Sequence, residues 1–113
     1  MFASAGEIDV LCEYAIGFLL SRQGDAKRLA VRLTEAAPER RPMEVIFVLS
    51  SAAASIEEVL AGEEAVALAL DAWRVAALMG VDLHMMQVLG HPHGRCADVM
   101  HYWRSEDGFF LSG

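Results

Sequence analysis

Apolar residues recur every three or four positions along most of this chain, which is the spacing of one face of an α-helix. The segment 25–37 shows the pattern most clearly, because its apolar and charged residues fall on opposite sides of a helix. Gly24 and Asp25 open this segment, and Pro38 ends it because the proline ring cannot continue the hydrogen-bond ladder. Its apolar face consists of Ala26, Leu29, Ala30, Leu33 and Ala37.

A first helix is predicted at 7–21. Ser4, Ala5 and Gly6 precede the acidic Glu7, and an acid in the first turn complements the helix dipole. One apolar stripe follows at helical spacing, and further apolar residues widen it. The stripe consists of Ile8, Leu11, Cys12, Ala15 and Leu19.

The segment 43–50 is ambiguous, because its β-branched and aromatic run 45–48 has strand propensity. A strand needs a pairing partner, and no other segment has the pattern of one. Pro42 suits the first position of a helix, and the polar residues that follow share a narrow arc at helical spacing. We therefore predict one helix at 42–61.

The segment 63–89 continues the helical pattern and is apolar around most of its circumference. Its charged residues project into a wedge of about 100°, so this helix is expected to be buried on several sides, with a kink or break at Gly80. A short helix at 95–104 and an apolar tail complete the chain. The fold class is therefore all-α: a compact bundle of four principal helices plus a short C-terminal helix, in a single domain spanning 1–113.

The apolar fraction, 55% of 113 residues, is high for so small a domain. Some of this surface remains exposed unless a second chain covers it, so we expect a homodimer. Leu70 and Trp73 are candidates for the centre of its interface or for the adjoining core, and both Trp73 and Trp103 are expected to be mostly buried. The apolar tail is expected to dock on its own bundle beside Trp103 or on the second subunit. The tail residues are Phe109, Phe110 and Leu111.

Charge and cysteine content narrow the class of protein further. A net charge of −7 favours solubility and disfavours contact with phosphate backbones. Cys12 and Cys96 are too few for a disulfide framework, and no secretory signal precedes the first helix. No apolar stretch is long enough to span a membrane. These features predict a soluble cytoplasmic protein.

All four histidines and Cys96 fall between residues 84 and 101. Histidine and cysteine are side chains that bind transition metals. Cys96 and His101 lie about 140° apart around a helix, so one ion cannot easily bind both. Asp98 and His101 do share a helix face. The more feasible partial metal site therefore consists of His91, His93, Asp98 and His101.

Two other reactive arrangements lie in the same stretch. His84 with its neighbours Met85 and Met86 has the residue types of a haem or metal site, although a packed core or interface histidine is the simpler interpretation. Cys96 near a helix N-terminus has the residue type of a nucleophile, but no third orienting residue or oxyanion hole is recognisable.

The segment 22–41 holds six of the nine basic residues. Acidic residues stand beside its arginines at helical pairing distance, and no polar recognition helix follows.

The sequence therefore favours a non-enzymatic protein that acts through self-association or through another protein, without a cofactor. The alternative is a small metal- or haem-binding protein that uses the cluster 84–101, and the third hypothesis is a nucleic-acid-binding regulator that uses 22–41.

Overall fold

The computed structural model describes residues 5–112, which form five α-helices and, within that range, no strand. The all-α prediction is confirmed, with four principal helices and a short C-terminal one. Their bounds are α1 Ala5–Leu20, α2 Ala26–Ala36, α3 Pro42–Val59, α4 Glu63–Val88 and α5 Cys96–Ser105.

The helix ends follow from local chemistry. The Asp25 side chain accepts a hydrogen bond from the backbone N–H of Arg28 (2.9 Å) and so caps α2. Pro42 is the first residue of α3, which resolves the ambiguous segment 43–50 as helix. Gly62 precedes α4 with φ +104°, a conformation that favours glycine, and lets the chain reverse between α3 and α4.

Two sequence predictions about helix limits need correction. The helix predicted from residue 7 already includes Ala5 and Gly6, whereas Ser4 lies outside the described residues. The break expected at Gly80 is absent, and α4 runs through it as one helix of 26 residues. Its Cβ position faces open space and the backbone keeps helical geometry, so the glycine weakens the helix without ending it.

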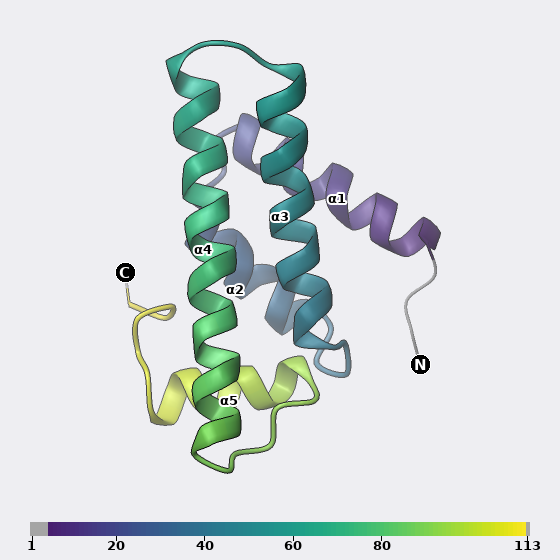
Figure 1. Cartoon of the computed structure of the whole chain (residues 1–113). Helices are drawn as coiled ribbons and strands as arrows, with labels where there is room; N and C mark the ends of the chain where they lie inside the picture. Colours follow the sequence, from purple (N-terminus) through teal and green to yellow (C-terminus); the bar gives the residue numbers. More distant parts are fainter. Residues whose placement is uncertain (1–4, 113) are drawn as a thin grey trace.

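The helices form two layers. Figure 1 shows α3 and α4 side by side as an antiparallel hairpin, with α1, α2 and α5 behind it. Alanines on the facing sides of α3 and α4 let the two helices approach closely, because a methyl group fills little space. The buried alanines of the pair are Ala52, Ala53, Ala65, Ala69, Ala72 and Ala76.

Two carboxylates on the rear side of α4 hold the second layer. Asp71 accepts a hydrogen bond from the backbone N–H of Ala26, at the start of α2 (3.0 Å). Asp82 accepts one from the indole Nε1–H of Trp103 in α5 (2.9 Å). These two acids lie about three helical turns apart on one side of α4, so they fix where α2 and α5 sit.

The apolar tail docks within its own chain, but only in part. Phe110 is 3% exposed and stacks on Trp103, with ring centroids 4.3 Å apart. Lys27 of α2 donates hydrogen bonds to the carbonyl oxygens of Phe109 and Ser112 (3.2 and 3.0 Å) and fastens the segment. Phe109 and Leu111 were expected to dock as well, but they remain exposed because Phe110 alone enters the gap beside Trp103.

We predict that Phe110→Ala lowers the free energy of unfolding by about 3 kcal/mol, because it empties a buried aromatic site. The matched control is Phe109→Ala, at a neighbouring phenylalanine that is 49% exposed, and it should cost about 1 kcal/mol or less. Urea unfolding of both variants checks this. Equal losses would mean that the tail does not pack as described.

Candidate functional site

The most distinctive surface of the molecule is an exposed, mostly apolar side of α4. Residues there recur at intervals of three and four, which keeps them within about 80° of arc over roughly 33 Å of helix. We call this set the outer stripe: Val66, Leu70, Trp73, Ala77, Gly80, His84 and Val88.

The outer stripe is a different side of α4 from the buried face. Gly80 is half-buried and the other members are exposed, while Ala69, Ala76 and Met79 of the same helix are buried in the core. Helix α4 therefore carries apolar residues on two of its sides, and within residues 5–112 one of these sides is largely exposed.

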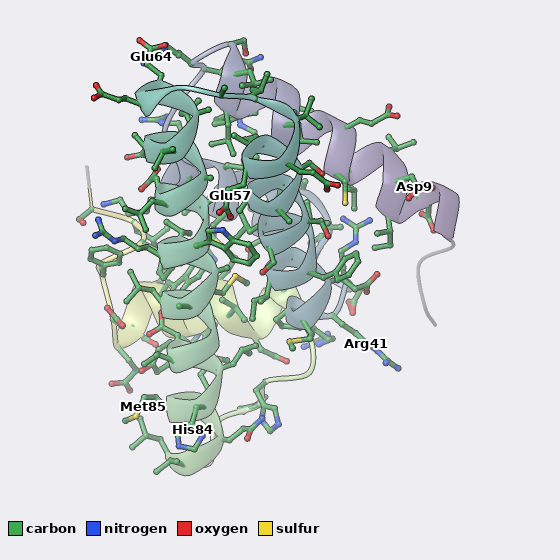
Figure 2. All side chains as sticks on the ribbon, turned by 45° about the horizontal axis from the view of Figure 1, so that its top comes forward. Asp9, Arg41, Glu57, Glu64, His84 and Met85 are labelled. Atoms are coloured by element: carbon green, nitrogen blue, oxygen red, sulfur yellow. The ribbon has the colours of Figure 1, made fainter. Side chains whose placement is uncertain are left out.

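Trp73 was expected to be mostly buried and is 38% exposed instead. Its indole Nε1–H donates to a carboxylate oxygen of Glu57 in α3. Figure 2 shows Glu57 between the two helices of the hairpin. The prediction was wrong because Trp73 lies on an apolar stripe of α4 that faces solvent and not the core.

Further exposed apolar side chains flank the outer stripe. The exposed Arg74 lies among them. So many exposed apolar residues on one helix are unusual in a protein that works alone, where such residues are scattered. Leu70 and Trp73, the two helix residues predicted for an interface, both belong to the stripe, whereas Phe109, Phe110 and Leu111 belong to the tail described above. The flanking residues are Leu78, Val81, Met85 and Leu89.

Charge is unevenly distributed along this surface. Four glutamates surround the turn between α3 and α4, and Arg22 pairs with one of them, Glu64 (3.0 Å). Figure 2 shows Glu64 at that end, with Arg41 and His84 toward the opposite end. The four acids are Glu57, Glu58, Glu63 and Glu64.

The histidines of the predicted metal site do not converge. His91 lies beside Glu106 (3.9 Å) and against the ring of Tyr102, while the Nδ1 of His93 contacts the carbonyl oxygen of His91 (3.1 Å). His101 is exposed on α5. In residues 5–112 no three histidine, cysteine or acidic side chains are grouped to hold a metal ion.

Asp98, the fourth predicted ligand, has a local structural role. Its carboxylate accepts hydrogen bonds from the backbone N–H of Arg95 (3.1 Å) and from the Arg95 guanidinium (3.3 Å). The same guanidinium also pairs with Glu39 (3.3 Å). Asp98 therefore caps α5 and helps tie it to the α2–α3 turn.

His84 and its methionine neighbours also point apart. His84 is exposed on the outer stripe, whereas Met86 is fully buried in the core on the opposite side of α4. Two residues that are two positions apart on a helix differ by about 200° around its axis, so His84 and Met86 do not face one ligand. The geometry favours the interface interpretation of His84.

Burial makes the Cys96 thiol unsuited to act as a nucleophile. Burial raises the pKa of Cys96 to about 11, with Arg40 lowering that pKa and Glu44 raising it by smaller amounts. The reactive form of cysteine is the thiolate, which is scarce at neutral pH for such a group. Burial also raises the pKa of Cys12, the other thiol of the chain.

Several basic side chains of 22–41 are engaged within the molecule. Lys27 holds the tail, Arg22 pairs with Glu64, and the Arg32 guanidinium lies over the ring of Phe18 (5.4 Å). This arrangement does not gather the segment's charge on one open face, so it gives no particular support to nucleic-acid binding.

The Asp82 carboxylate is buried, although from the sequence Asp82 is only one of the charged residues on the polar side of its helix. Burial raises its pKa to about 6, the hydrogen bond from Trp103 lowers the pKa, and the nearby Asp107 raises it. The hydrogen bond that joins α4 to α5 therefore depends on a carboxylate whose ionisation is disfavoured in the folded protein.

The chain matches no model of a protein family, no curated protein and no solved structure. In the part of the chain that the structure describes, no helix is both long enough and apolar enough to cross a membrane.

We predict that Asp82→Asn stabilises the protein at pH 8 by about 1–3 kcal/mol and changes its stability little at pH 4. The pKa of Asp82 is higher in the folded protein than in the unfolded chain, so its stabilising contribution is complete below about pH 4 and is lost as the pH rises through about 6. An asparagine side chain still accepts the Trp103 hydrogen bond and does not ionise.

Unfolding of both proteins in urea between about pH 4 and pH 8 measures this difference. Asp82→Ala is the control, since it removes the acceptor for Trp103 and should destabilise the protein even at the acidic end of that range. A difference between the aspartate and asparagine forms that stays constant with pH would contradict the argument.

We also predict that replacing His91, His93 and His101 together with glutamine changes the free energy of unfolding by less than about 1 kcal/mol, because their side chains lie at the surface and in turns. Elemental analysis of untagged protein should find no stoichiometric metal. A loss above about 2 kcal/mol, or a bound metal that the substitutions remove, would favour the metal-binding hypothesis.

Proposed function

We propose that this protein acts without catalysis, as a helical module that associates with a second copy of itself through the outer stripe of α4. The observation that carries the proposal is the exposure of the stripe. Its residues are mostly apolar, recur at intervals of three and four, and lie outside the buried face of α4. This spacing is typical of a helix that packs along another helix.

The hydrophobic effect supplies the driving force for this association. Removing apolar surface from water is worth about 25 cal/mol per Å². A stripe of roughly 33 Å allows contact along most of a helix, and the flanking apolar residues widen it. A stable interface buries at least about 1,200 Å² in total, which two copies of one long helix and its neighbours can provide.

The small residues of the outer stripe support a helix partner in particular. Ala77 and Gly80 lie near its middle, and a Cβ atom added to Gly80 would meet nothing within 4 Å. Packed helices lie about 8–10 Å apart, and small side chains at the point of contact permit that approach.

We predict that Leu70→Lys weakens self-association by about 100-fold or more. Two-fold symmetry places the substitution in the interface twice, and an unpaired ammonium group buried there costs several kcal/mol. Light scattering across micromolar concentrations measures the mass of the protein in solution.

The matched control is Leu20→Lys. Leu20 and Leu70 are similarly exposed (42% and 45%), but Leu20 ends α1 and is not a member of the outer stripe. The control should keep the mass of the unmodified protein. A monomeric mass for the unmodified protein at every concentration would contradict the proposed function.

A further inference from the structure

The outer stripe is asymmetric in side-chain size about its midpoint. Trp73 lies four residues before Ala77, and Gly80 lies three residues after it. The space above Gly80 is open, because an added Cβ atom there would meet nothing within 4 Å. The surface therefore combines a large ring on one side of Ala77 with an open position on the other.

An antiparallel arrangement of two copies matches these sizes. With the symmetry axis beside Ala77, each residue faces the one equally far on the other side of Ala77 in the second copy. Val66 then faces Val88, and Leu70 faces His84. Trp73 is four residues before Ala77 and Gly80 is three residues after it, so Trp73 of one copy lies within one residue's rise of Gly80 in the other. The large side chain of each copy thus lies next to the open position of the other.

A parallel arrangement fits poorly. Each residue would then face its own counterpart, so the two Trp73 rings would meet while Ala77 and Gly80 faced their counterparts across a gap. Bulky residues would hold the helices apart at one point and leave a cavity at the next, which costs packing energy.

The charges favour the same direction. In parallel copies the acidic turn around Glu63 and Glu64 would face its counterpart, and like charges repel. In antiparallel copies the two acidic turns lie at opposite ends of the pair, so this repulsion is absent.

We propose that two copies of this chain pair antiparallel along the outer stripe, with a two-fold axis beside Ala77. This inference rests on the proposed self-association and adds its direction and register. An interface of this kind is closed, because the same surface is used by both copies.

Cysteine cross-linking tests the direction. Val66→Cys and Val88→Cys are made as separate proteins, one carrying a mass tag, and are mixed under mild oxidation. Antiparallel pairing places position 66 of one copy beside position 88 of the other, so the mixed cross-link should be at least about 10-fold more abundant than either self-cross-link. Two positions 66 would then be roughly 33 Å apart, far beyond the Cα separation of a disulfide, about 4.4–6.8 Å.

Two controls make the readout specific. The unmodified protein measures the background of cross-linking, which should be low because Cys96 is buried and burial raises the pKa of both Cys12 and Cys96. Val10→Cys places a thiol on α1 at a valine about as exposed as Val66 (64% and 63%), and it should not cross-link with either variant.

The outcomes separate this inference from the proposed function. Self-cross-links at 66 and at 88, in a protein with a dimeric mass, would overturn the antiparallel direction and leave self-association intact. A dimeric mass without any of these cross-links would overturn the outer stripe as the interface. A monomeric mass would overturn the proposed function itself.

Discussion

Helix α4 organises the molecule through carboxylates on one of its sides. Asp71 accepts a hydrogen bond from the first backbone N–H of α2, and Asp82 accepts one from the indole N–H of Trp103 in α5. A buried polar group is stable only where it has a partner, so these two bonds restrict where α2 and α5 can lie. The core then forms between α4 and the helices behind it.

The same constraint leaves the outer stripe uncovered. With α2 and α5 held behind α4 and with α3 beside it, residues 5–112 place no further helix in front. A chain of 113 residues has a large surface for its volume, and within residues 5–112 this side of the 26-residue helix stays largely exposed. The proposed self-association would cover that surface.

The fold gives side chains of the histidine- and cysteine-rich stretch 84–101 structural roles. Asp98 caps α5, His91 packs against Tyr102, and Cys96 lies in the core. The residue types suggested metal binding or nucleophilic chemistry, but the fold places these side chains in different surroundings. Residue type and nearness in sequence do not bring side chains to a common point.

Local patterns determined much of this fold. Helical spacing placed all five helices of the described range, and Pro42 identified the ambiguous segment 43–50 as the start of one of them. These features depend on neighbours three or four residues apart, which a sequence displays directly. Docking of the tail was also predicted, on its own bundle beside Trp103 or on a second subunit, since an apolar end favours burial. Phe110 takes the first of these positions, whereas Phe109 and Leu111 stay exposed.

Only the tertiary structure decided which apolar side of α4 is buried. Trp73 and Trp103 both lie on apolar stripes, yet Trp103 joins the core and Trp73 stays at the surface. The choice depends on where Asp71 and Asp82 meet residues far along the chain. Such long-range contacts leave no periodic signal, because their partners are set by the packing of whole helices.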